Sequence, residues 1–180
     1  MPFIILDRDG VINFDSNEYI KSPEEWRAIP GSLHAIATLN RCGFRVLLAT
    51  NQSGIARGYF DIITLDCIHE KLTAELASHG GYVEEIFFCP HHPDDQCLCR
   101  KPKPGLLHQM QKKYPLNLAE TYFIGDSLSD IEAAYAAGCL PLLVKTGNGE
   151  YWLQKKPELA EIPHFTDLAE AALHIITKGR

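Results

Sequence analysis

The sequence has no long apolar run, and this absence excludes a membrane-spanning protein. No window of its 180 residues approaches the length that a transmembrane helix needs. A basic segment followed by an apolar helix is also missing at the N-terminus, which opens with Phe3-Ile4-Ile5-Leu6 instead. These absences predict a cytoplasmic protein with no membrane partner.

Positive charge is scarce as well. The chain carries 17 Lys and Arg against 23 Asp and Glu, a formal net charge of -6. Because so few cations can displace the counterions of a phosphate backbone, the composition predicts no nucleic-acid partner. A small anionic substrate would then need a locally basic pocket. The length supports one buried core, so we expect a single domain over residues 1–180 and a monomer.

Short apolar stretches alternate with helical patterns along the chain. We expect strands at residues 3–6, 45–49, 83–88, 121–124 and 140–144, helices at 32–41, 62–79, 105–114, 129–137 and 167–178, and a loop at 157–163. This alternation predicts an α/β fold, a three-layer, doubly wound parallel sheet of the Rossmann type. Ligands of such sheets bind at the carboxyl ends of the strands, where the strand order reverses. A predicted helix between Asp7 and Thr50 leaves no room for a cap domain, so the site should be open to solvent.

Two carboxylates, Asp7 and Asp9, follow the first expected strand, and Gly10 softens the turn behind them. One carboxylate could attack an electrophilic phosphorus, while the other could protonate the leaving oxygen and later activate water. An isolated pair of this kind more often caps a turn. The downstream segments decide between these interpretations.

The segment Thr50-Asn51-Gln52-Ser53-Gly54 follows the second expected strand. Its hydroxyls, side-chain amides and backbone N–H groups form a set of donors that suits a phosphoryl group. A helix cap followed by a turn explains the segment equally well when it is taken alone.

Three of the six cysteines lie with two histidines in one short segment, residues 89–99. The metal ligands that we expect there are Cys89, His91, Cys97 and Cys99. Their spacing is typical of a closed, tetrahedral Zn²⁺ site in a reducing compartment, with no open position for catalysis. We therefore predict a structural zinc loop that presents Arg100 and Lys101. His92 is an alternative ligand to His91, and a chance Cys-rich loop is the competing interpretation.

Three cations follow this loop in the run Arg100-Lys101-Pro102-Lys103-Pro104, where the prolines restrict the backbone. A fixed Lys suits a phosphoryl oxygen, and an Arg fork suits a second phosphate or sugar oxygens. Such a run of cations is usually exposed to solvent and has no function. In a chain with an excess of acidic residues, a cluster of cations beside an expected metal-binding loop instead favours a role in binding.

Gly125-Asp126 ends the fourth expected strand, and Asp130 follows at the start of a helix. The helix dipole accounts for Asp130 but not for a carboxylate at the end of a strand. Asp7, Asp126 and the backbone carbonyl of Asp9 would give Mg²⁺ the hard oxygen ligands that it prefers. The ion would also reduce the repulsion between an anionic nucleophile and an anionic phosphate.

In order along the chain, these segments resemble the four motifs of the haloacid dehalogenase (HAD) superfamily of phosphatases. The matching segments are Asp7 to Gly10 (DxDG), Thr50, Lys101, and Gly125 to Asp130 (GDxxxD). The resemblance implies a HAD-like fold and a Mg²⁺-dependent phosphoric monoester hydrolase. By position, it implies that Asp7 is the nucleophile, which forms an aspartyl-phosphate, and that Asp9 is the acid and then the base. It further implies that Thr50 and Lys101 stabilise the phosphoryl group and that Asp126 binds the metal.

Over nearly the whole chain, the segments TNQSGIARG, CPHHP and RKPKPG resemble a cap-less branch of this superfamily that acts on phosphorylated sugars. The resemblance implies substrate contacts from Asn51, Gln52, Ser53 and Arg100. Two departures from the pattern of this branch leave the identity of the substrate open. Ser127 stands where this branch often has a Lys that contacts phosphate, and the zinc loop is short, as in histidinol-phosphate phosphatases.

Two further alternatives lie outside sugar chemistry. A zinc-stabilised interaction module without activity would require a broken catalytic set, and the sequence retains every member of that set. A nucleic-acid 3′-phosphatase conflicts with the acidic balance of the chain.

Overall fold

A parallel sheet of six strands, in the order β3-β2-β1-β4-β5-β6, forms the centre of the computed structural model, which describes residues 2–178. The strands are β1 (Phe3–Leu6), β2 (Arg45–Asn51), β3 (Glu85–Cys89), β4 (Tyr122–Gly125), β5 (Leu140–Val144) and β6 (His164–Phe165). Every neighbouring pair is parallel, and the strand order reverses at β1, which lies between β2 and β4.

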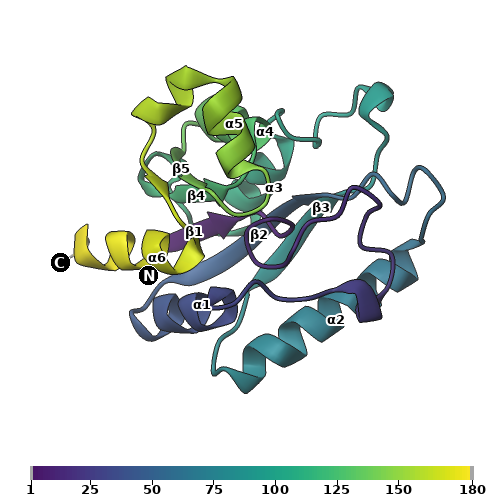
Figure 1. Cartoon of the computed structure of the whole chain (residues 1–180), viewed down its shortest axis with the longest axis horizontal. Helices are drawn as coiled ribbons and strands as arrows, with labels where there is room; N and C mark the ends of the chain where they lie inside the picture. The colour runs from purple at the N-terminus through teal and green to yellow at the C-terminus, as the bar shows by residue number, and fades with distance from the viewer. Residues whose placement is uncertain (1, 179–180) are drawn as a thin grey trace.

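Helices cover both faces of the sheet. They are α1 (Ser32–Arg41), α2 (Ile62–Ser78), α3 (Gly105–Lys113), α4 (Leu128–Ala137), α5 (Gly149–Lys155) and α6 (Leu168–Lys178). Helices α1, α2 and α6 pack together on one face, and α3, α4 and α5 lie on the other (Figure 1). The three-layer, doubly wound fold predicted from the sequence is confirmed.

The sequence of β1 is apolar without interruption because both faces of this strand are buried. Side chains alternate between the two faces of a strand, and here both faces are covered. Ile4 and Leu6 enter the core beneath α1, α2 and α6, whereas Phe3 and Ile5 enter the core beneath α3 and α4. This burial anchors β1 and so fixes the position of Asp7, the residue that follows it.

Three features near the C-terminus differ from the expectation. The two-residue strand β6 and the seven-residue helix α5 were not predicted, because neither is long enough to develop a recognisable period. Residues Pro157–Glu161, expected as loop, form a 3₁₀ helix that buries Leu159 against the sheet.

The connection between β1 and α1 contains only one short 3₁₀ helix, Pro23–Glu25, and no cap domain within the described residues. Trp26 is fully buried in this connection, and Ser32 donates a hydrogen bond of 2.6 Å to the carbonyl of Ile12. The connection is therefore packed onto the domain rather than forming a separate unit.

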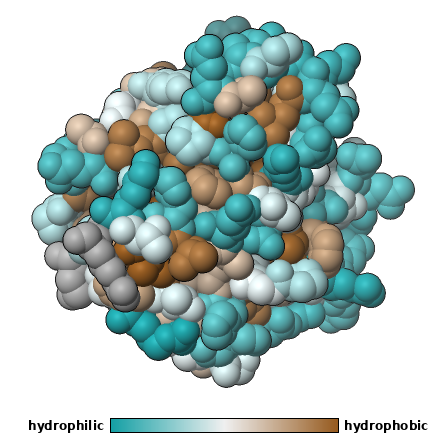
Figure 2. Space-filling view, turned by 60° about the vertical axis from the view of Figure 1, so that its left-hand side comes forward, coloured by the Kyte–Doolittle hydropathy of each residue, from teal (hydrophilic) through white to brown (hydrophobic). Residues whose placement is uncertain are grey.

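No helix among residues 2–178 is both long and apolar enough to cross a membrane. On the face that Figure 2 shows, hydrophobic side chains lie in small patches bordered by hydrophilic ones. Scattered apolar exposure of this kind is ordinary for a folded domain.

Candidate active site

The predicted polar segments meet at the carboxyl ends of β1, β2 and β4, beside the reversal of strand order. They line a pocket of about 320 Å³. Its walls are formed by Asp7, Asp9, Asp15, Ser16, Asn17, Tyr19, Ile20, Thr50, Asn51, Gln52, Ser53, Arg100, Lys101, Asp126, Ser127, Ser129 and Asn148. The structure thus brings together every catalytic and substrate-contact residue that the sequence predicts.

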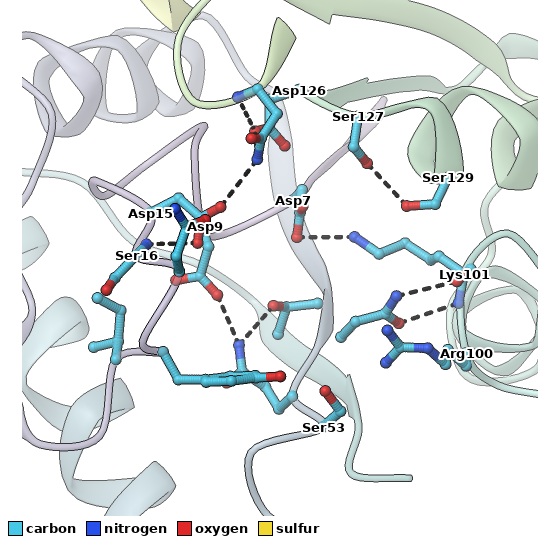
Figure 3. A pocket seen from close by; sticks show the side chains of 17 residues that line it. Asp7, Asp9, Asp15, Ser16, Ser53, Arg100, Lys101, Asp126, Ser127 and Ser129 are labelled. Atoms are coloured by element: carbon cyan, nitrogen blue, oxygen red, sulfur yellow. Dashed lines mark hydrogen bonds and ion pairs between the residues drawn. The ribbon is translucent and has the colours of Figure 1, made fainter. Parts of the chain in front are cut away.

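Asp7 and Lys101 form the centre of the pocket (Figure 3). The Lys101 ammonium lies 2.9 Å from Asp7 Oδ1 and 2.6 Å from Asp130 Oδ1, and it donates to the carbonyl of Ala49 at 2.8 Å. The backbone N–H of Arg8 also donates to Asp7 Oδ1, at 2.7 Å. Within the described residues, the polar contacts of the Asp7 carboxylate therefore all involve Oδ1, which leaves Oδ2 without a polar partner.

Burial and the nearby charge of Asp130 raise the pKa of Asp7 to about 7, although the charge of Lys101 and its hydrogen bond act to lower it. Burial and the charges of Asp130 and Asp7 raise the pKa of Asp126 well above its ordinary value. The protein alone thus leaves uncompensated negative charge at this point, which a cation would neutralise.

The ligand atoms of Asp7, Asp126 and Asp130 lie within 4.8 Å of one another. Asp130 is already occupied, since Oδ1 faces Lys101 and Oδ2 accepts hydrogen bonds from the N–H and hydroxyl groups of Ser127. Asp7 and Asp126 are therefore the carboxylates best placed to hold Mg²⁺. The Asp9 carboxylate lies outside this group, so its predicted contribution remains that of its backbone carbonyl.

Two glycines make room for the Asp126 carboxylate. Gly10 has a φ of 80° and Gly147 a φ of 59°, and a Cβ atom on either one would overlap Asp126 Oδ2. The N–H of Asn148 donates to the same oxygen at 2.8 Å. The carboxylate is thus held between two turns that only glycine can form at this distance.

Asp9 is fixed by neighbouring side chains rather than by Lys101. Arg8 donates three hydrogen bonds of 2.9–3.1 Å to it, Asn13 donates one of 2.8 Å, and Gln52 donates one of 2.9 Å. Burial acts to raise the pKa of Asp9, but the Arg8 charge and these hydrogen bonds outweigh it and lower the pKa. Asp9 is therefore an ionised carboxylate in the resting protein.

Arg8 itself is completely buried. Its Nη1 lies 3.2 Å from His69 Nε2, on α2. Burial, followed by the Arg8 charge, lowers the pKa of His69 to about 3, so the ring is neutral and Nε2 accepts from the guanidinium. Sequence reasoning missed this network, although His69 interrupts an otherwise apolar helix face.

One wall of the pocket was also missed. This wall consists of Asp15, Ser16, Asn17, Tyr19 and Ile20, and Tyr19 also packs on Tyr59 with 5.1 Å between the ring centroids. Asn148 donates to Asp15 at 3.0 Å and so links this wall to the turn after β5. These residues therefore form a wall that was not predicted from the sequence. Asn148 could have been predicted, because it follows the end of a strand, as the other site residues do. Residues 15–20 could not, because their sequence has no periodic pattern.

Arg100 supplies a cation to the opposite wall, between Lys101 and Ser53 (Figure 3). Its Nη1 atom is buried and has no hydrogen-bond partner within residues 2–178. A buried guanidinium N–H without a partner is costly, so this donor is suited to an anionic or hydroxyl-bearing ligand. Ser127 and Ser129 face the same region with their hydroxyl oxygens 2.9 Å apart.

The Cys and His side chains of residues 89–99 converge as the spacing predicts. The cluster consists of Cys89, His91, Cys97 and Cys99, whose ligand atoms lie within 4.8 Å of one another. The sulfur atoms are 3.2–3.6 Å apart, and His91 Nδ1 is 3.2 Å from Cys99 Sγ. His92, the alternative ligand, instead accepts from the N–H of Asp94 as the cap of a short 3₁₀ helix.

Comparisons with known proteins agree with this geometry. The HAD-hydrolase-like family model matches residues 98–171. A D-glycero-β-D-manno-heptose-1,7-bisphosphate 7-phosphatase of Pseudomonas putida is 53% identical over 177 residues, which are 98% of this chain and 100% of that protein. A protein of the same name from Bordetella bronchiseptica is 56% identical over 149 residues, 83% of each chain.

Solved structures extend the likeness to three dimensions. The D,D-heptose 1,7-bisphosphate phosphatase of B. bronchiseptica, solved with magnesium and phosphate, matches with a TM-score of 0.96 and 50% identity over 99% of both chains. The corresponding phosphatase of Burkholderia thailandensis matches with a TM-score of 0.78 and 37% identity, over 98% of this chain and 99% of the other.

Near-complete coverage at this identity, with the motif residues assembled in one pocket, establishes the family. The chain belongs to the D-glycero-β-D-manno-heptose-1,7-bisphosphate 7-phosphatases, a family of HAD-like phosphoric monoester hydrolases.

Proposed function

We propose that this protein removes the 7-phosphate of D-glycero-β-D-manno-heptose 1,7-bisphosphate in a Mg²⁺-dependent reaction. The observation that carries the proposal is the pairing of Asp7 with Lys101 at 2.9 Å, in a pocket that also contains Arg100. One cation serves the phosphoryl group under attack, and the other is free for the remote phosphate or the sugar oxygens.

In the first step, Asp7 Oδ2 attacks the phosphorus atom and the bond from phosphorus to the sugar oxygen breaks. Asp9 donates a proton to that leaving oxygen, so the products are the sugar alcohol and an aspartyl-phosphate on Asp7. The approaching anionic phosphate first raises the pKa of Asp9, because it adds negative charge beside the carboxylate, and Asp9 takes up this proton from solvent before the attack. Lys101 and the Thr50 hydroxyl stabilise the charge on the transferring oxygens.

In the second step, Asp9 accepts a proton from water, and the water oxygen attacks the phosphorus of the aspartyl-phosphate. The bond between phosphorus and Asp7 Oδ2 breaks, which releases inorganic phosphate and restores the Asp7 carboxylate. Asp9 regains its ionised form when the proton leaves to solvent. Over both steps one water molecule is consumed for each phosphate released.

Asp7 and Asp126 would hold Mg²⁺, together with the backbone carbonyl of Asp9 and water. The ion supplies positive charge that lets an anionic nucleophile approach an anionic phosphate. Magnesium is present in the complex of the B. bronchiseptica relative, which supports Mg²⁺ as the ion.

We also propose that the cluster of residues 89–99 binds structural Zn²⁺. A tetrahedron with Zn–S bonds of about 2.3 Å has edges of about 3.8 Å, close to the 3.6 Å that separates Cys97 Sγ from each of the other two sulfurs. Lys103 donates to the carbonyls of Gln96 and Cys97 at 3.1 and 2.7 Å, so an ordered loop also orders the segment that carries Lys101.

Histidinol phosphate is the second candidate substrate, because the zinc loop is short. Phosphate release from both compounds, with ³¹P NMR of the sugar product, tests the proposal. We expect a much higher kcat/KM for the heptose bisphosphate, and a product that keeps only the C1 phosphate. Preference for histidinol phosphate, or loss of the C1 phosphate, would contradict the proposal.

A further inference from the structure

The two amide side chains that follow Thr50 are engaged with the protein rather than directed at free space. Asn51 Nδ2 donates to the carbonyl of Lys101 at 3.1 Å, and the N–H of Lys101 donates to Asn51 Oδ1 at 3.1 Å. Two opposite residues of an antiparallel sheet exchange the same pair of hydrogen bonds, one in each direction. The pair that Asn51 makes joins the end of β2 to a segment fifty residues further along the chain.

Gln52 makes the equivalent connection to the other half of the site. Its Nε2 donates to Asp9 Oδ2 and to Thr50 Oγ1, both at 2.9 Å. A side-chain amide nitrogen carries two hydrogens, so these bonds use both of them. Gln52 is also nearly fully buried, at 3% exposure, so its amide has little access to a ligand.

We propose that Asn51 and Gln52 are positioning residues: the Asn51 amide fixes the backbone of Lys101, and the Gln52 amide fixes the carboxylate of Asp9. The end of β2 then aligns two groups that reach the pocket from distant parts of the chain. Substrate contact on this wall falls to Ser53 and Arg100. Only the roles of Lys101 and Asp9 in this inference rest on the proposed function.

A positioning residue and a substrate contact respond differently to the size of the substrate. A lost contact to the sugar lowers kcat/KM only for a substrate that has the sugar. A misplaced Lys101 or Asp9 lowers it for any phosphomonoester, because the reacting phosphoryl group is common to all of them. Phenyl phosphate, which has no sugar, separates the two cases.

Asn40, in α1 and a few residues before the start of β2, provides a matched control. Its amide also makes two backbone bonds, donating to the Phe44 carbonyl at 3.2 Å and accepting from the Tyr82 N–H at 2.8 Å. It takes no part in lining the pocket. Asn40→Ala therefore removes two hydrogen bonds between a side-chain amide and the backbone, as Asn51→Ala does, but at a position outside the pocket.

The experiment measures hydrogen exchange of single amides by NMR, and kcat/KM for both substrates. In Asn51→Ala we expect the exchange rate of the Lys101 amide to rise at least about tenfold. We also expect kcat/KM to fall about 10- to 100-fold, and to fall equally for the two substrates. Gln52→Met should lower both kcat/KM values together. Asn40→Ala should raise the exchange of the Tyr82 amide alone and leave turnover unchanged.

Asn51→Asp keeps the acceptor for the Lys101 N–H and serves if the alanine variant does not fold. Its Lys101 amide should exchange within about threefold of the wild-type rate. Unchanged Lys101 exchange in Asn51→Ala, or losses confined to the sugar substrate, would overturn the inference. Failure of the wild-type protein to hydrolyse the heptose bisphosphate would refute the proposed function, while the exchange rates and phenyl phosphate kinetics would still test the inference.

Discussion

Arg8 and Asp9, adjacent in the chain, are joined by three hydrogen bonds of 2.9–3.1 Å, and the guanidinium is completely buried. The proposed acid and base of the site is thus also the counterion of a buried cation. The surroundings of Asp7 instead disfavour its charged form, because burial and a neighbouring carboxylate raise its pKa to about 7. The two aspartates of the same motif therefore differ in what they contribute to stability.

Asp9→Asn should lower the free energy of unfolding by about 3 kcal/mol, because it leaves the Arg8 charge without a buried partner. Asp7→Asn, which removes a poorly compensated charge, should change it by less than about 1 kcal/mol. Urea unfolding without Mg²⁺ compares the two variants with the wild type. Equal losses in the two variants would contradict this difference between the two aspartates.

Stability should fall in acid because His69 is held neutral. Its pKa is about 3 in the folded protein, against an ordinary value of 6.5, so the unfolded chain binds the additional proton. Between pH 7.5 and 5.5 this one group should cost about 1.4 kcal/mol, a loss that His69→Gln removes. Unfolding curves at the two pH values measure it, with His34→Gln at an exposed position of α1 as the control. An unchanged pH slope in His69→Gln would contradict the assignment.

Gly147→Ala should weaken Mg²⁺ use, since the new methyl group would overlap the Asp126 carboxylate. We expect the Mg²⁺ concentration for half-maximal activity to rise at least about tenfold. Gly31→Ala is the matched control: its φ of 86° imposes similar backbone strain, but its Cβ meets no atom within 4 Å. The same metal dependence in both variants would mean that Asp126 does not bind the ion.

Zinc should be present at one ion per chain, and it should not replace Mg²⁺ in turnover. Cys99→Ser should lower the zinc content and raise KM, because the segment that carries Arg100 and Lys101 loses its anchor. Cys67→Ser, at an exposed position of α2, should change neither quantity. Elemental analysis with steady-state kinetics decides the matter, and a zinc-free protein with wild-type kinetics would refute the coupling.

Much of this molecule could be predicted because its fold repeats one simple pattern. Apolar strands such as β1 are buried on both faces, and each strand end delivers polar residues to one edge of the sheet. That rule is enough to locate Asp7, Thr50 and Asp126 from the order of residues along the chain. It could also have located Asn148.

The hydrogen-bond partners of the polar side chains could not be predicted from the sequence. Asn51 and Gln52 look like donors to a ligand, and their chemistry is the same when the acceptor is the protein. Sequence reasoning assigns no role to Arg8, because nothing in the order of residues reveals that α2 supplies His69 to it. The monomeric state and the cytoplasmic location stay predictions.

The central claim is that Asp7 is the nucleophile, and trapping with Mg²⁺ and BeF₃⁻ tests it most directly. BeF₃⁻ mimics a phosphoryl group bound to a carboxylate, so a crystal structure of the trapped protein should show the adduct on Asp7 with Lys101 beside it. Asp7→Asn should form no adduct and lose turnover, since an amide of nearly the same shape is a poor nucleophile. An adduct on another residue, or substantial phosphatase activity in Asp7→Asn, would contradict the account.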